Sequence, residues 1–201
     1  MKALLNILLL TLATASPAAA QHVAPDALVK GVTLEVVDLI TKDKEIKAGS
    51  RAKLIQVIEA KVLPHFNFGA MTALAMGQSW NKASPEQKKQ LTEEFKTLLV
   101  RTYAGALTQV KDQTVALRPF RAAPEDTEVV VRTEIKGKGE PIQLDYRLEK
   151  ANPDWKIYDV NVLGVWLVEQ YRGQFAQDIN AGGIEALIDK LAERNKGAAK
   201  S

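Results

Sequence analysis

The side chains that could carry catalysis or bind a metal are few and scattered. Cysteine is absent, and of the two histidines His22 lies near the N-terminus while His65 stands at the expected end of a helix. No second histidine, cysteine or Asp/Glu pair lies near His65 in the sequence, so we interpret it as a packed or helix-terminal imidazole. Ser50 and Ser84 have the spacing of helix caps, and Ser79 lacks the surroundings of a nucleophile elbow. The sequence therefore predicts no catalytic residue, no metal site and no cofactor.

Two residues of the segment 162–175 have unexpected positions for a core-facing helix. At about 100° per residue, one apolar stripe contains Val165, Val168, Tyr171, Phe175 and Ile179. Arg172 falls inside this stripe, and Trp166 points away from it. A cation on an apolar face indicates a buried acid as its partner, with Asp159 our first choice and Asp145 the second. An indole beside the stripe either covers a neighbouring element or lines an opening.

The first twenty residues have the layout of a secretory signal peptide. Lys2 precedes the apolar run 4–12, and three alanines end the segment at Ala20. We expect cleavage before Gln21, leaving one domain over residues 21–201 in the bacterial periplasm. The whole chain has 27 Lys and Arg against 24 Asp and Glu, and these charges are interspersed. Nucleic-acid binding is therefore not expected.

The first half of the chain has the periodicity of α-helices. Asp26 is expected to cap the first helix and Ser50 the second, which Pro64 ends. The segment 65–80, interrupted by two glycines, predicts short packed helices. Ser84 and Gln87 have the spacing of a capping box at the start of a long helix that continues to about Val110.

After residue 111 the apolar period changes from about 3.6 to 2 residues, which indicates β-strands. We expect four strands, over residues 114–121, 128–136, 142–150 and 155–162. The short connections between them favour an antiparallel meander, and a sheet with one apolar face must bury that face under the helices. Two helices, over residues 164–180 and 184–194, complete an α+β fold.

Many residues in the middle and at the end of the chain together have a familiar pattern. They are Val62-Leu63-Pro64, Phe68, Met71, Gly77, Trp80, the 87–103 helix, Trp155-Lys156-Ile157-Tyr158-Asp159-Val160, Gly164-Val165, Leu167-Val168, Tyr171-Arg172 and Gln174-Phe175. The pattern resembles the MlaC family of periplasmic phospholipid carriers, also called the toluene-tolerance family, over nearly all of the expected mature chain. The sequence departs from the family's usual residues at Asn67, Leu163, Trp166 and Gln170.

The resemblance implies an NTF2-like α+β fold, in which a twisted four-stranded antiparallel sheet packs under several helices around a deep apolar cavity. The cavity would hold one diacyl glycerophospholipid with its head group in solvent, and no metal or nucleotide. The implied partners are an inner-membrane ABC transporter complex with an MCE-domain ring and an outer-membrane lipoprotein associated with a porin. The implied function is to shuttle phospholipid between them, which maintains outer-membrane lipid asymmetry.

A lipid carrier needs such a cavity on physical grounds. Two acyl chains contain on the order of 30 methylene groups at roughly 0.8 kcal/mol each, so exposing them to water would cost about 20 kcal/mol. The inward sheet face and helix stripes must therefore leave apolar space unfilled. The residues expected to contact the lipid are Phe68, Met71, Phe95, Leu99, Tyr103, Val131, Leu144, Tyr146, Tyr158, Val160, Val165, Trp166, Val168, Arg172 and Phe175.

Two questions stay open at this point. Arg172 could bind the lipid phosphate at the cavity mouth instead of pairing with a buried acid, although we favour the buried pair. The alternatives to a lipid carrier are an enzyme on an NTF2-like scaffold with a small apolar substrate, and a periplasmic chaperone for apolar peptide segments.

Overall fold

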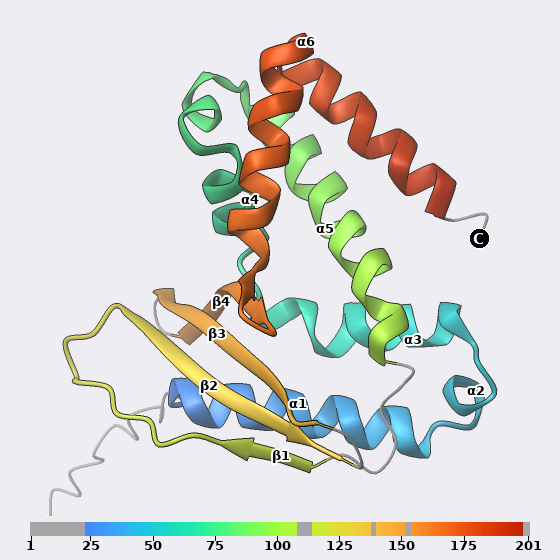
Figure 1. The fold of residues 1–201 in the computed structure, drawn as a ribbon, viewed down its shortest axis with the longest axis vertical. Helices are drawn as coiled ribbons and strands as arrows, with labels where there is room; N and C mark the ends of the chain where they lie inside the picture. Colours follow the sequence, from blue (N-terminus) through green and yellow to red (C-terminus); the bar gives the residue numbers. More distant parts are fainter. Residues whose placement is uncertain (1–22, 108–113, 138–139, 152–153, 199–201) are drawn as a thin grey trace, which may run out of the picture.

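The computed structural model describes residues 23–107, 114–137, 140–151 and 154–198. The predicted signal peptide and the predicted end of the long helix near Val110 lie outside the described residues. Figure 1 shows a sheet with one helix along it, and a group of helices that extends away from the sheet. In the described part of the chain, none of the helices combines the length and the apolar character needed to cross a bilayer.

The sheet is antiparallel, with its strands in sequence order. The strands are β1 Thr114–Leu117, β2 Glu128–Lys136, β3 Ile142–Ala151, β4 Asp154–Val162 and β5 Val165–Trp166. The four predicted strands are confirmed, although β1 ends at Leu117 instead of residue 121. The fifth strand was not predicted, because Val165 and Trp166 were assigned to the following helix. A tight turn at Leu163 and Gly164 sends the chain back along β4 before the helix begins.

A β-bulge in β4 sets which side chains share a face. Leu148 of β3 lies opposite Ile157, but the preceding Arg147 lies opposite Asp159, so Tyr158 is an extra residue in β4. The alternation of β4 therefore changes phase at the bulge. Apolar residues at odd positions before it and at even positions after it point to the same side of the sheet.

Helices precede and follow the strands in the sequence. They are α1 Pro25–Lys42, α2 Lys44–Lys47, α3 Arg51–Lys61, η1 Leu63–His65, α4 Phe68–Met76, η2 Gly77–Lys82, α5 Pro85–Leu107 and α6 Leu167–Ala198. Within α6, Gly183 has a φ of 81° and interrupts the helical backbone. The prediction of two C-terminal helices is confirmed, because α6 consists of two helical arms joined at this glycine.

Local capping signals were correct at two helices and wrong at one. The Ser84 hydroxyl accepts the Gln87 N–H at 3.1 Å, and the Gln87 side chain accepts the Ser84 N–H at 2.9 Å. Ser50 accepts the N–H of Lys53 at the start of α3. Asp26 does not cap α1, which already begins at Pro25. Proline has the φ angle required at the first helical position, so the helix starts before the acid.

The buried core is divided into three clusters. The helical cluster joins α4, α5 and α6 around Phe95 and Phe175. The sheet cluster joins α1 to the strands around Val131 and Leu148, and a third cluster joins α1, α2, α3 and α5 around Leu54. A domain usually has one contiguous core with smaller satellites. Phe66 is partly buried and packs against both the helical cluster and the sheet cluster, so these two clusters meet at its ring.

Candidate functional site

The sheet face that packs against α1 is apolar, and part of it is uncovered. Its side chains form rows of directly opposed residues: Val129, Leu148 and Ile157; Val131, Tyr146 and Val160; and Thr133, Leu144, Val162 and Val165. The first row is buried, with Leu148 and Ile157 at most 1% exposed. In the other two rows the β2 residues Val131 and Thr133 are 0% exposed, whereas Tyr146 and Leu144 of β3 are partly buried and Val165 of β5 is 49% exposed.

The arrangement of the helices explains this gradient. Helix α1 contacts β1 and β2, whereas β4 is contacted by α4 and α6. The middle of β3 and the end of β4 therefore keep accessible apolar side chains, although both strands have neighbours on either side. Apolar residues in the centre of a sheet are normally close-packed. We define Leu144, Tyr146, Val160, Val162 and Val165 as the open sheet face.

Tyr146 provides the open sheet face with a polar group. Burial raises the pKa of its phenol, and the hydroxyl groups of Thr33 on α1 and Thr133 on β2 act in the opposite direction. The phenol is therefore neutral at physiological pH. It can donate or accept a hydrogen bond within otherwise apolar surroundings.

The predicted lipid contacts on the helices lie in a different environment. The helical cluster contains Met71, Phe95, Leu99, Val168 and Phe175 as buried members, and Phe68, Tyr103 and Tyr158 as partly buried neighbours. Phe95 makes edge-on ring contacts with Tyr171 and Phe175, at centroid distances of 5.0 and 5.1 Å. The buried members thus fill their own cluster. The partly buried ones keep surface that a ligand could contact.

Helices line two surface pockets in the described part of the chain. A pocket of about 450 Å³ lies among α3, η1, α4 and α5, with Leu63, Pro64 and Phe68 as its apolar part. A pocket of about 270 Å³ lies between the two arms of α6 and includes Phe175. Neither is the expected cavity between sheet and helices, so that cavity stays a prediction.

A polar junction on the opposite sheet face connects β4 to the start of α6. Asp159 is 1% exposed, and its Oδ1 accepts the backbone N–H groups of Val160 at 2.8 Å and Val168 at 3.1 Å. Val168 is the second residue of α6, so the carboxylate satisfies an N–H that the helix leaves unpaired. Burial raises the pKa of Asp159, and the two backbone bonds and the charge of Arg147 oppose this rise.

Arg147 is the cation of this junction. Its Nη1 lies 3.3 Å from Asp159 Oδ2 and 3.0 Å from Glu169 Oε1. Its guanidinium carbon lies 3.8 Å from the centre of the Trp166 ring, which is a cation–π contact. Trp166 thus covers the charged pair on the polar face and does not belong to the open sheet face. We predicted Trp166 as a lipid contact, and its position offers no direct support for that role.

The predicted buried partner for Arg172 is wrong. Asp159 pairs with Arg147, and the second choice, Asp145, has Arg132 Nε at 4.0 Å. Arg172 is exposed, with its guanidinium near Gly77 at the end of α4, and it has no ion pair with any of the described residues. A long side chain whose Cα lies on an apolar helix stripe can still extend its charged end to solvent, so the stripe alone did not require a buried charge.

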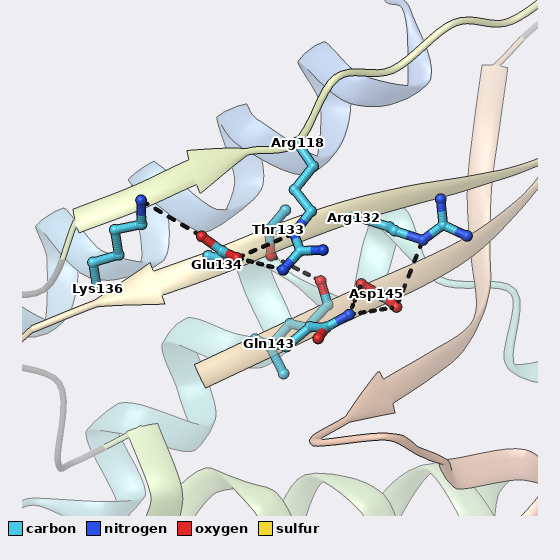
Figure 2. Close-up of polar contacts among 8 residues, drawn as sticks. Arg118, Arg132, Thr133, Glu134, Lys136, Gln143 and Asp145 are labelled. Carbon is cyan, nitrogen blue, oxygen red and sulfur yellow. Dashed lines mark hydrogen bonds and ion pairs between the residues drawn. The ribbon is translucent and has the colours of Figure 1, made fainter. Parts of the chain in front are cut away.

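Figure 2 shows the rest of this polar face. Gln143 and Arg132 point toward Asp145, while Arg118 and Lys136 point toward Glu134. The sheet therefore has one apolar and one charged face, as the alternation in β3 predicted. The pairing of Arg147 with Asp159 was not predicted, because it depends on the bulge at Tyr158.

The chain matches a known protein family over most of its length. The model of the family described as MlaC protein matches residues 30–193. The chain is 26% identical over 141 residues to the intermembrane phospholipid transport system binding protein MlaC of Haemophilus influenzae. This alignment covers 68% of this chain and 66% of that protein, which is slightly less than two thirds of that protein's length. It is 26% identical over 170 residues to toluene tolerance protein ttg2D of Pseudomonas putida, covering 84% of this chain and 78% of that protein.

A solved structure is similar both in sequence and in fold. It is the phospholipid-binding protein from Ralstonia solanacearum in complex with a phospholipid. The two chains are 46% identical, and the superposition has a TM-score of 0.82 and covers 87% of this chain and 98% of that one. The α+β fold with an antiparallel sheet is thereby confirmed.

Proposed function

Because this chain belongs to the MlaC family, we propose that it is a periplasmic phospholipid carrier that binds one diacyl glycerophospholipid. Proteins of this family are phospholipid carriers and not enzymes, which argues against an enzyme with a small apolar substrate. The phospholipid in the Ralstonia solanacearum structure supports the same class of ligand for this chain. A periplasmic location also supports the interpretation of residues 1–20 as a signal peptide.

The observation that carries the proposal is the open sheet face beside a divided core. Leu144, Val160 and Val162 are apolar, central in the sheet and still accessible. Acyl chains would cover these side chains and remove their surface from water, which stabilises the complex by about 25 cal/mol for each Å² buried. The partly buried Phe68, Tyr103 and Tyr158 would contact the same ligand from the helical side.

The head group would remain in solvent at the exposed end of the sheet, near Val165. We propose that the carrier exchanges lipid with two membrane assemblies, an inner-membrane ABC transporter complex with an MCE-domain ring and an outer-membrane lipoprotein–porin complex. The Haemophilus influenzae relative, named as the binding protein of an intermembrane phospholipid transport system, supports membership in such a system. Such exchange would maintain the lipid asymmetry of the outer membrane.

Organic extraction followed by mass spectrometry tests the proposal directly. Protein purified under mild conditions from a bacterial periplasm should contain about one phospholipid per chain. Folded protein without lipid would contradict the proposal, and bound peptide in place of lipid would favour a chaperone.

A pair of variants tests which surface binds the lipid. Leu144→Asp places a charge on the open sheet face and should remove most of the bound lipid, because an acyl chain cannot solvate a carboxylate. Leu74→Asp makes the same change on α4, where Leu74 is 44% exposed, and should leave the lipid content unchanged. Equal lipid content in the two folded variants would show that the open sheet face is not the binding surface.

A further inference from the structure

The hydroxyl groups of Tyr146, Thr33 and Thr133 meet at the edge of the open sheet face. Thr133 lies diagonally across the sheet from Tyr146, because it is directly opposite Leu144, two residues earlier on β3. Thr33 approaches from α1, and both threonine hydroxyls hydrogen-bond with the phenol of Tyr146. That phenol is the one polar group among the side chains of the open sheet face, which are otherwise leucine and valine.

The protons of the two threonine hydroxyls are already committed. Thr33 Oγ1 donates to the Val29 carbonyl at 2.7 Å, and Thr133 Oγ1 donates to the Leu144 carbonyl at 3.0 Å. Each threonine oxygen can therefore only accept from the phenol, and the single proton of Tyr146 serves one of them at a time. If the phenol donated to a ligand instead, both threonines would keep their backbone hydrogen bonds. Redirecting that proton thus leaves no buried donor unpaired.

Tyr146 stands between the filled and the accessible parts of the apolar sheet face. On one side along β3, Leu148 is 0% exposed, whereas Leu144 on the other side is partly buried and belongs to the same row as Val165. Two residues of a strand span about 7 Å, so Tyr146 lies one row inside the exposed end, where we place the head group.

This depth matches one part of a glycerophospholipid. At the length per bond of an extended chain, the acyl ester carbonyls lie about 6 Å from the phosphorus atom, and the ends of the acyl chains lie roughly 20 Å farther. An ester carbonyl is an acceptor without a proton of its own, so it needs a donor when it leaves water. An acyl chain has neither donor nor acceptor. The ester is therefore the lipid group that suits the phenol.

We propose that the Tyr146 hydroxyl donates a hydrogen bond to an acyl ester carbonyl of the bound lipid and so makes the protein select diacyl lipids over dialkyl ether lipids. The proposal rests on the carrier function proposed above. It adds the linkage between the glycerol and its chains as a determinant of selectivity. Thr33 and Thr133 accept the phenol proton when no lipid is bound.

A competition between two lipids tests this selectivity. Delipidated protein is incubated with vesicles of equal amounts of diester and diether phosphatidylethanolamine with chains of the same length, and the bound lipid is extracted and identified by mass spectrometry. The wild type should bind the diester in about fivefold excess, which is the effect of one hydrogen bond. Tyr146→Phe should lose this excess, because it lacks only the donor, and the diether costs less to remove from water.

Tyr171→Phe is the matched control. It removes the same oxygen atom inside the helical cluster, where Tyr171 is 4% exposed, and leaves the open sheet face unchanged. It should keep the fivefold excess of diester. A thermal melt of each delipidated variant establishes that it is folded.

The outcomes separate this proposal from the carrier function. Equal binding of the two lipids by the wild type would overturn the role of Tyr146, and this measurement does not depend on the folding of any variant. A diester excess that persists in folded Tyr146→Phe would overturn it too, as would an excess that disappears in folded Tyr171→Phe. Wild-type protein that binds neither lipid would instead contradict the carrier function.

Discussion

Arg147→Ala should destabilise the fold strongly, because it leaves the buried carboxylate of Asp159 without its cation. Removing one partner of a buried ion pair costs about 3 to 5 kcal/mol. We expect the lower end, about 3 kcal/mol, because the Arg147 side chain is 30% exposed and Asp159 keeps two backbone hydrogen bonds. For a domain of this size such a loss lowers Tm by about 6 to 12 °C.

The pH dependence of this loss identifies its cause. Burial raises the pKa of Asp159, while Arg147 favours the ionised form and opposes that rise. Removing Arg147 should therefore raise the pKa further. The loss of stability should be complete at neutral pH, where Asp159 is ionised, and should decrease as the pH falls through the pKa of Asp159, because a neutral carboxyl group does not need a cation.

The contribution of Asp159 to the stability of the wild-type protein should also depend on pH. Since the pKa of Asp159 is higher in the folded than in the unfolded chain, its contribution to stability is fully present below the unfolded pKa. That contribution is lost as the pH rises through the folded pKa.

Thermal melts of delipidated wild type, Arg147→Ala and Arg172→Ala at neutral and acidic pH provide the measurement. Arg172→Ala is the matched control, and as an exposed residue without an ion pair to the described residues it should change stability by less than about 0.5 kcal/mol. A loss in Arg147→Ala below about 1 kcal/mol, or an equal loss at both pH values, would refute the assignment of Arg147 as the counterion.

Three further variants test individual features of the fold. Trp166→Ser removes the cation–π contact to Arg147 and should therefore lose about 1 kcal/mol of stability but keep its bound lipid. Loss of lipid from a folded Trp166→Ser variant would show that Trp166 contacts the lipid. Ser84→Ala should lose about 1 kcal/mol in urea denaturation, since it removes the cap of α5, and an unchanged midpoint would show that the cap is dispensable. Gly77→Ala should lose about 1 to 2 kcal/mol, because Gly77 has a φ of 55°; a neutral result in a thermal melt would mean that the turn after α4 can relax.

The local elements of this fold could be predicted because their signals act over a few residues. The capping box at Ser84 and Gln87 involves residues three apart, and the bonds formed are those expected. The alternation in β2 and β3 identified both strands and separated their apolar and charged faces. The resemblance to the MlaC family rested on residues spread over the chain, and the family match over residues 30–193 confirms it.

The partners of charged residues could not be predicted in the same way. The helical stripe placed Arg172 on an apolar face, but it does not specify where the tip of a long side chain lies. Arg147 meets Asp159 only because Tyr158 is an extra residue in β4, which sets Arg147 and Asp159 directly opposite each other. Trp166 likewise reaches Arg147 because the turn at Leu163 makes it part of a strand instead of a helix.

The candidate site also combines features that the sequence predicted with features that depend on tertiary contacts. The sequence by itself determined that Leu144, Tyr146 and other inward residues of the strands are apolar and share a face, since side-chain alternation is a property of the strand. Only the tertiary structure decided which of them remain uncovered. Helix α1 lies over β1 and β2 and the other helices form a separate cluster, so accessible apolar surface is left on β3 and β4. Whether a side chain is packed depends on elements that are distant in the sequence. Because the hydrophobic effect is non-directional, the local sequence does not specify which element covers an apolar side chain.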